Sequence, residues 1–199
     1  MNERFFELPS EKQDKMINAA LKIFACNGYK HASTDDIVKE AQISKGLLFH
    51  YFISKEGLYR FLVEYSVRYL LNEYQYAIGE EKEYFAFHEK YEQAKLSVLR
   101  NYPYMAGFIE KAIHESNVSI REKSNDAINQ YIETINGLRS GIVMPNIKSG
   151  VDMMHIENMI EFTIRGLTDK HMASDNPNPD ALYEQIGDYM TVIKNLVCA

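Results

Sequence analysis

Apolar residues recur at three- and four-residue intervals from Met16 to Val197, a spacing that places them on one face of successive helices. The alternation of apolar and polar residues that marks strands is not sustained anywhere along the sequence. Proline is scarce, and most glycines lie where an apolar segment ends. The chain is therefore predicted to be all-α.

The pattern predicts about nine helices. Their expected ranges are 11–27, 34–41, 45–52, 54–79, 84–100, 103–115, 118–140, 152–172 and 179–197. Ser10 and Gln13 have the spacing of a capping box before the first helix, and Gly28 is expected to end that helix in a left-handed conformation. Ser44 is placed to cap the third helix.

Two short helices, 34–41 and 45–52, follow a longer one and are joined by about three residues. This order is typical of a helix-turn-helix, whose second short helix enters the major groove of DNA. Leu48 and Phe52 are four residues apart and should face the neighbouring helices. The outer side and N-terminal end of the helix are then left to Lys45, Gly46, Leu47, Phe49, His50 and Tyr51.

The chemistry of that outer face suits DNA. Phenol, imidazole and ammonium groups can bind phosphate oxygens, and an apolar edge can contact a thymine methyl group. A glycine inside a helix costs about 1 kcal/mol relative to alanine. Gly46 is therefore better explained by close approach to a sugar-phosphate backbone than by folding.

The net charge of −6 is unevenly distributed along the chain. Residues 1–55 carry eight Lys/Arg and seven Asp/Glu, whereas the remainder carries fourteen and twenty-one. The acidity belongs to the second part, so the overall charge does not exclude DNA binding.

The segment from Ser33 to Phe52, with Lys55–Leu58 behind it and Phe24 and Asn27–Tyr29 before it, resembles the signature of the TetR family of transcriptional regulators. The motif covers residues 12–63, and beyond it the resemblance extends to the number and arrangement of helices. It implies a three-helix helix-turn-helix DNA-binding domain over 1–55. A larger helical ligand-binding and dimerisation domain would then occupy 56–199.

The resemblance also implies which residues contact DNA. Phosphate contacts are expected from Thr34, His50, Tyr51 and Lys55, and contacts to base edges or backbone from Lys45, Gly46 and Leu47. Phe49 occupies a position where the family often has tyrosine, so an apolar base contact is expected in place of a hydroxyl–phosphate bond.

A single helix-turn-helix contacts only a few base pairs, so useful affinity requires a two-fold dimer. In proteins of the family the last two helices of each subunit form a four-helix bundle. The resemblance therefore implies a homodimer through helices 152–172 and 179–197, both of which carry apolar stripes.

The region between these parts is rich in tyrosine and phenylalanine, which suits a pocket for a small, partly apolar effector but is equally compatible with an ordinary helical core. The candidate ligand contacts are Tyr69, Tyr91, Phe108, Tyr131 and Phe162. Acidic residues on the same helices leave a cationic effector open. The pairs Glu110/His114 and His88/Glu92 lack a third metal ligand, so no metal is expected.

The resemblance, together with the aromatic-rich region, implies a repressor that binds a palindromic operator in double-stranded DNA and is released by an effector. No enzyme activity or cofactor is expected, because the sequence lacks a nucleotide-binding loop and a hydrolase motif. The two cysteines and the lack of a signal peptide or membrane span predict a cytoplasmic protein. Two alternatives remain: a helical small-molecule-binding protein or enzyme whose DNA head is unused, and a TetR-like activator.

Overall fold

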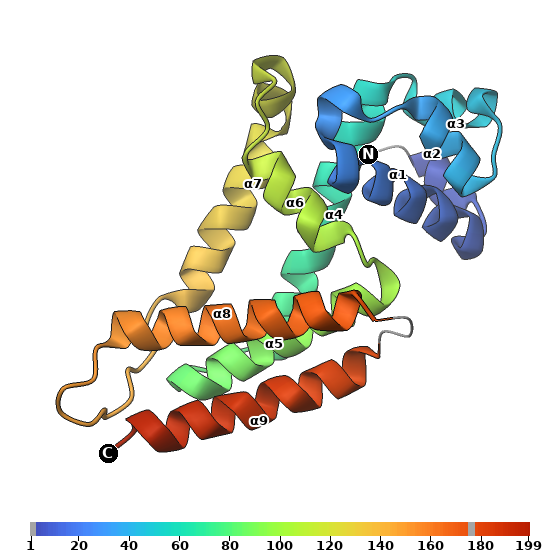
Figure 1. Ribbon diagram of the computed structural model, residues 1–199. Coiled ribbons are helices and arrows are strands. Elements are labelled where there is room, and N and C mark those ends of the chain that lie inside the picture. Colours follow the sequence, from blue (N-terminus) through green and yellow to red (C-terminus); the bar gives the residue numbers. More distant parts are fainter. Residues whose placement is uncertain (1–2, 175–177) are drawn as a thin grey trace. The chain divides into compact units, whose positions relative to one another are not determined.

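The computed structural model describes residues 3–174 and 178–199 and confirms an all-α chain with about nine helices (Figure 1). Most predicted boundaries agree with it to within two residues. The helices are η1 (Glu3–Glu7), α1 (Ser10–His31), α2 (Thr34–Ala41), α3 (Lys45–Phe52), α4 (Lys55–Ile78), α5 (Tyr84–Asn101), α6 (Met105–Ile113), α7 (Val118–Arg139), α8 (Met153–Met172) and α9 (Pro179–Val197).

The chain divides into two compact units. Unit 1 comprises Met1–Asn72 and Val98–Gly137, and unit 2 comprises Glu73–Ser97 and Leu138–Ala199. Helices α4, α5 and α7 each contribute residues to both units. The division at residue 55 between a DNA-binding and a ligand-binding domain is functional rather than geometric and stays a prediction.

The core of the helix-turn-helix head, which comprises α1, α2 and α3, forms where the apolar faces of these helices meet. Met16 and Phe24 of α1, Ile37 of α2, and Leu48 and Phe52 of α3 are all buried. Burying side chains of this size stabilises the fold by about 1.5–3 kcal/mol each. The prediction that Leu48 and Phe52 face inward is confirmed.

Helix α1 differs from its prediction at both ends. Gly28 is left-handed as expected, with φ of 67°, but the chain resumes helical geometry and continues to His31. The capping-box prediction is wrong, because Pro9 is the N-cap and makes no side-chain capping bond. Instead, Gln13 Nε2 donates to the carbonyl oxygens of Leu8 at 2.7 Å and Phe6 at 3.2 Å.

Short-range hydrogen bonds fix the two ends of α3. At its start, Ser44 Oγ accepts from the Leu47 N–H at 3.1 Å, which confirms the predicted cap. At its end, Ile53 has φ of 65° and ψ of −45°, and Ser54 N–H donates to Phe52 O at 2.6 Å. This is the geometry of a γ-turn, which strains a β-branched residue.

Gly57 allows α4 to begin immediately after that turn. A Cβ atom at Gly57 would lie 2.1 Å from the backbone oxygen of Phe52. The Gly57 N–H donates to Ser54 Oγ at 3.0 Å, which holds the first turn of α4 in place. The angle between α3 and α4 therefore depends on a residue without a side chain.

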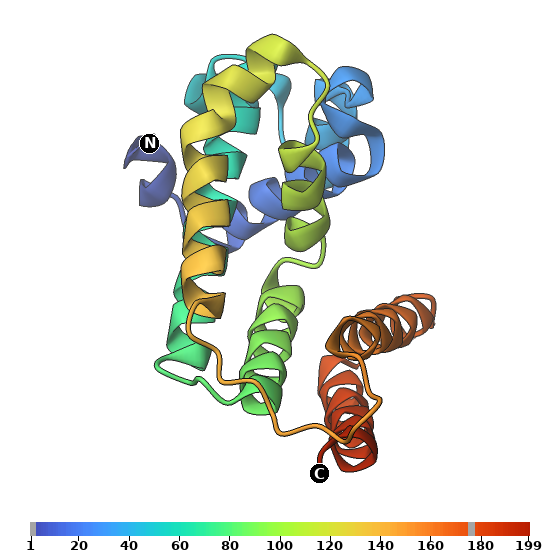
Figure 2. The same ribbon diagram turned by 90° about the vertical axis from the view of Figure 1, so that its left-hand side faces the viewer.

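In unit 2, α8 and α9 lie against each other in both views (Figures 1 and 2). Their helix starts are capped by Asp152 and Asn178, whose side chains accept backbone N–H bonds. The residues buried on the two helices are Ile156, Ile160, Ile164, Leu182, Ile186, Met190, Ile193 and Val197. These residues are buried within one chain.

Candidate DNA interface and ligand-binding residues

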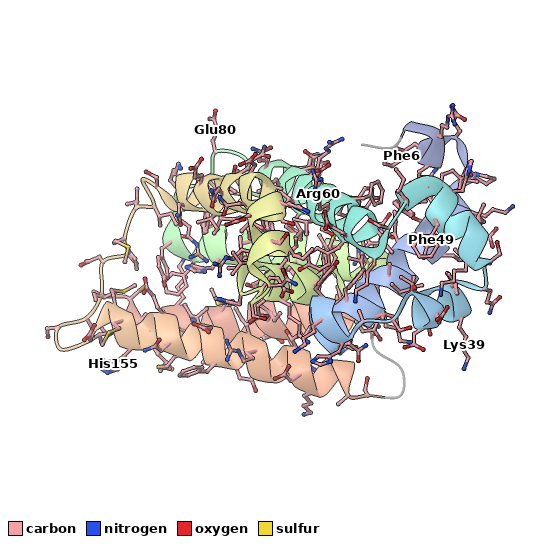
Figure 3. All side chains as sticks on the ribbon, turned by 90° about the horizontal axis from the view of Figure 1, so that it is seen from above. Phe6, Lys39, Phe49, Arg60, Glu80 and His155 are labelled. Carbon is pink, nitrogen blue, oxygen red and sulfur yellow. The ribbon has the colours of Figure 1, made fainter. Side chains whose placement is uncertain are left out.

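The outer side of α3 is open to solvent over its first two turns. Lys45, Gly46 and His50 are exposed, whereas Leu47 and Phe49 are half-buried. Figure 3 labels Phe49 on α3 and shows Lys39 extending outward from α2. Because the core-facing residues of α3 are buried, this face is the part of the helix that remains available to a partner.

The Lys45 ammonium forms an ion pair with Asp35, with Nζ 2.8 Å from Oδ1. The side chains are 50% and 71% exposed, so the pair contributes no more than about 1 kcal/mol. A phosphate or guanine edge could replace the carboxylate at small cost. The pair also links the N-terminal turns of α2 and α3.

Among the described residues, no neighbour of Gly46 requires the absence of a side chain there. The nearest atom to an added Cβ would be Ser44 Oγ at 4.0 Å, outside a close contact. Gly57 is the opposite case, because backbone occupies the space that its Cβ would need. This contrast supports the hypothesis that the small size of Gly46 serves an external partner.

An N-terminal turn that the sequence pattern did not predict supports the end of α3. Phe5 of η1 is fully buried, and its ring centroid lies 5.8 Å from Tyr51, 5.1 Å from Phe52 and 5.2 Å from Phe61. The Tyr51 ring also meets His50 edge-on at 5.0 Å. Two predicted DNA contacts are therefore held by aromatic packing.

Lys55 is engaged with the protein itself. Its Nζ donates to Ala32 O at 2.7 Å and Lys30 O at 3.4 Å, and lies 4.7 Å from the centroid of the Tyr29 ring. Burial lowers the pKa of the Lys55 ammonium. The side chain ties the end of α1 to the start of α4, and a contact to phosphate stays a prediction.

Thr34 is half-buried at the first position of α2, and the capping bond is made by the residue before it. Ser33 Oγ accepts from the Asp35 N–H at 3.1 Å. The Thr34 hydroxyl therefore has no capping role, and its proposed phosphate contact is compatible with this position at the helix start.

A hydrogen-bonded chain connects the head to α4 within unit 1. Tyr102 donates to Asp14 Oδ1 at 2.8 Å, and the hydroxyl groups of Tyr65 and Tyr102 lie 2.7 Å apart. Burial and these bonds raise the pKa of Tyr102, so its hydroxyl keeps its proton. The chain joins α1 to the middle of α4.

The candidate ligand contacts in unit 1 have different surroundings. Tyr69 accepts a hydrogen bond from Asn101 Nδ2 at 3.1 Å, and Tyr131 is half-buried. Phe108 is 1% exposed and packs against Tyr59, with ring centroids 5.2 Å apart. Phe108 is thus a core residue of this unit as the structure stands.

In unit 2, Tyr91 is half-buried and stacks on Tyr74 with ring centroids 4.8 Å apart. Phe162 is 64% exposed on α8 and does not share that environment. The structure therefore does not gather Tyr91 and Phe162 into one lining.

The exposed sides of α8 and α9 carry a second set of apolar residues. Figure 3 labels His155, whose side chain extends away from α8. Among the large apolar residues exposed on the two helices are Met159, Phe162, Tyr189, Val192 and Leu196. We call them the outer stripe. The sequence pattern did not separate these positions from the buried ones, because both are apolar.

Among the described residues, His, Cys, Asp and Glu side chains do not come together in groups of three or more that could hold a metal ion. None of the helices in the described ranges is long and apolar enough to cross a membrane.

The comparisons with known proteins find regulatory proteins that are similar to this chain. The family model described as "Bacterial regulatory proteins, tetR family" matches residues 16–61. The fatty acid metabolism regulator protein of Bacillus subtilis is 27% identical over 160 residues, which cover 77% of this chain and 79% of that protein.

Two solved structures show the same fold. KstR2, the ketosteroid transcriptional regulator of Mycobacterium tuberculosis, superposes with a TM-score of 0.66 at 16% identity, covering 100% of this chain and 97% of that chain. The transcriptional regulator FadR of Bacillus subtilis, in complex with stearoyl-CoA, gives a TM-score of 0.54 at 21% identity, covering 90% and 96%.

Proposed function

Because the chain belongs to the TetR family of bacterial transcriptional regulators, we propose that it is a repressor that binds a palindromic operator as a homodimer. It leaves the operator when a small, partly apolar effector binds its helical domain. The observation that carries the proposal is the outer face of α3, where no described residue lies close enough to Gly46 to require a glycine.

The operator contacts fall on one continuous segment. Lys45, Gly46, Leu47 and Phe49 meet base edges or backbone, and the phosphate contacts come from Thr34, His50, Tyr51 and Lys55. Lys45 is the one long hydrogen-bond donor in the first turn of α3, whereas Leu47 and Phe49 supply apolar contacts. Base discrimination then depends mainly on Lys45 and on the fit of the helix.

The outer stripe supports dimerisation through α8 and α9. Phe162 and Leu196 are 64% and 63% exposed, which is unusual for large apolar side chains on two adjacent helices. Two copies of the helix pair would bury them in a four-helix bundle. Phe162, one of the candidate ligand contacts, is better explained by this interface.

The effector is expected to be partly apolar. The FadR relative was crystallised with stearoyl-CoA, and KstR2 is a ketosteroid regulator, so acyl thioesters and steroids are the first compounds to test. Tyr69, Tyr91, Phe108 and Tyr131 remain the candidate contacts. For Phe108, binding would require the ring to leave its packing against Tyr59.

Release requires that the effector bind the non-operator conformation more tightly, and couplings of about 1–3 kcal/mol are common. Helix α4 is the element that carries the change, because it begins directly after the Ile53 turn that ends α3 and contributes to both units. Its hydrogen-bonded chain through Tyr65 and Tyr102 to Asp14 would move the head with it.

The decisive experiment selects genomic DNA fragments that bind the purified protein and then measures affinity for the selected site. Lys45→Ala with Tyr51→Ala is expected to weaken binding at least a hundredfold without changing the dimer mass. Lys12→Ala, at an exposed position of α1, serves as the matched control. Unchanged affinity in the double variant would refute the assignment of α3.

The purified protein and the selected DNA also distinguish this proposal from the two alternatives. A protein without sequence-selective DNA binding would be a helical small-molecule-binding protein or enzyme that does not use its DNA head. A protein that binds the operator but raises transcription from the neighbouring promoter would be an activator. Operator affinity that stays constant in saturating effector would refute release by a ligand.

A further inference from the structure

Five side chains of unit 2 gather along α5 and at the end of α7, and we call them the Arg139 cluster. They are Tyr84, His88, Tyr91, Lys95 and Arg139. Spacings of four, three and four residues put the first four on one face of α5. The Tyr84 and His88 rings lie 4.6 Å apart. Lys95 Nζ and Arg139 Cζ lie 5.6 and 5.7 Å from the centroid of the Tyr91 ring.

The positive charges of this cluster are only partly balanced. Lys95 forms an ion pair with Glu92 at 2.9 Å. Arg139 has a cation–π contact but no carboxylate within ion-pair distance in the part of the chain that the structure describes. Burial, with Arg139 and Lys95, lowers the pKa of His88 to about 4, so the imidazole is neutral at pH 7. The unbalanced charge therefore lies on Arg139, which is exposed to an incoming molecule.

The hydroxyl group of Tyr84 lacks a partner. The residue is 2% exposed, and its oxygen is buried without a hydrogen bond to any described residue. Burial raises the pKa of Tyr84 to about 12, so the group is a protonated donor at neutral pH. A buried donor without an acceptor is unfavourable, and an acceptor supplied by a ligand would recover that free energy.

The charges near Tyr84 come from two helices. Glu157 of α8 adds to the rise in the pKa of Tyr84, and Arg139 opposes it. Both groups are therefore close enough to act on an atom placed at the Tyr84 hydroxyl. Beside them, the Tyr91 ring stacks with Tyr74 at 4.8 Å and with Phe87 at 6.2 Å, which provides an apolar flank.

We propose that the Arg139 cluster holds an anionic group of the effector, a carboxylate or a phosphate. Arg139 is its counter-ion, and the Tyr84 hydroxyl donates a hydrogen bond to one of its oxygens. The apolar part of the effector lies along Tyr91 and Phe87. This inference rests on the proposed function, since it names the chemistry of the effector that releases the protein from its operator. It also predicts that the effector is not a cation.

The test uses four probes that share a twelve-carbon chain: dodecanoate, dodecyl phosphate, dodecanol and dodecyltrimethylammonium. Isothermal titration calorimetry of the full chain, below micelle-forming concentrations, is expected to show each anion binding about tenfold or more tightly than dodecanol. The trimethylammonium probe binds more weakly than dodecanol. The ranking of the two anions distinguishes a carboxylate from a phosphate ligand.

Variants assign the effect to named atoms. Arg139→Gln is expected to abolish the preference for anions and to leave dodecanol binding unchanged. Arg121→Gln, the same change at an exposed arginine in the first turn of α7, should retain the preference. Tyr84→Phe should weaken anion binding several-fold without lowering the melting temperature, because the buried hydroxyl makes no hydrogen bond to any described residue. Glu157→Gln should strengthen it.

Equal binding of dodecanol and the anions, no binding of either anion, or an unchanged preference in Arg139→Gln would overturn the proposal. The calorimetry contains no DNA, so the two proposals fail separately. If the protein prefers anions but binds no DNA fragment, only the proposal that it is a repressor is contradicted. A protein that binds its operator but shows no preference would contradict only the assignment of the Arg139 cluster.

Discussion

Replacing Gly46 with alanine is expected to stabilise the free protein and to weaken its binding to DNA. Alanine is favoured over glycine inside a helix by about 1 kcal/mol. At Gly46 the new Cβ meets nothing closer than Ser44 Oγ at 4.0 Å, so no packing cost opposes that gain. For a chain of this size the melting temperature should rise by roughly 2–4 °C.

Operator affinity should change in the opposite direction. If the backbone of Gly46 lies against DNA, the added methyl group displaces the first turn of α3 from the groove. Losing one or two good contacts there would cost about 1–3 kcal/mol, or roughly five- to 150-fold in affinity. The gain in folding stability and the loss in binding then occur in one variant.

Gly57→Ala is the matched control, because it makes the same chemical change where the protein has no room. Its Cβ would lie 2.1 Å from the Phe52 oxygen, so the backbone between α3 and α4 must move by about 1 Å. Such overpacking typically costs about 1–3 kcal/mol of folding stability. Urea denaturation and fluorescence anisotropy on the selected operator measure both quantities. A destabilised Gly46→Ala, or one with wild-type operator affinity, would refute the reasoning.

Three further changes test the structure. Ile53→Gly should raise the free energy of unfolding by about 1–2 kcal/mol in urea, because it removes a β-branched residue from a positive φ of 65°, and a loss would show that the turn is not strained. Phe162→Glu with Leu196→Glu should convert the proposed dimer to a monomer by light scattering, whereas Glu184→Gln, an exposed change on α9, should not. The pKa of His88 is about 4 in the folded protein and 6.5 in the unfolded chain, because burial disfavours the charged imidazole. The neutral imidazole therefore favours the folded state, and this contribution to folding stability is complete above pH 6.5. That contribution, up to about 3 kcal/mol, is lost as pH falls from 6.5 to 4. The pH profile of His88→Gln should therefore be flatter in chemical denaturation, and parallel profiles would contradict the burial argument.

Local features were predictable because their causes lie within a few residues of each other. The spacing of Leu48 and Phe52 identifies the inner side of α3, and the Ser44 cap acts on an N–H three residues away. Gly28 is left-handed, as its place after an apolar stripe indicates. The same local logic failed at Ser10 and Gln13, because the η1 turn offers Gln13 two carbonyl oxygens instead.

Residues that act over long sequence separations were not predictable in this way. Phe5 supports Tyr51 from forty-six positions earlier, and nothing in its local pattern indicates that contact. Lys55 fits a DNA-contact motif, yet its ammonium binds the oxygen of Ala32. Both outcomes depend on which surfaces the folded helices bring together.

The amino-acid sequence determined the helices, the outward side of α3 and the family, because helix periodicity and a contiguous motif are local properties. Only the tertiary structure decided which apolar residues are core. Ile160 and Phe162 stand two positions apart on α8 and are both apolar, but one is 3% exposed and the other 64%. The reason is geometric: α8 has one side packed on α9, and a residue two positions along a helix points almost the opposite way.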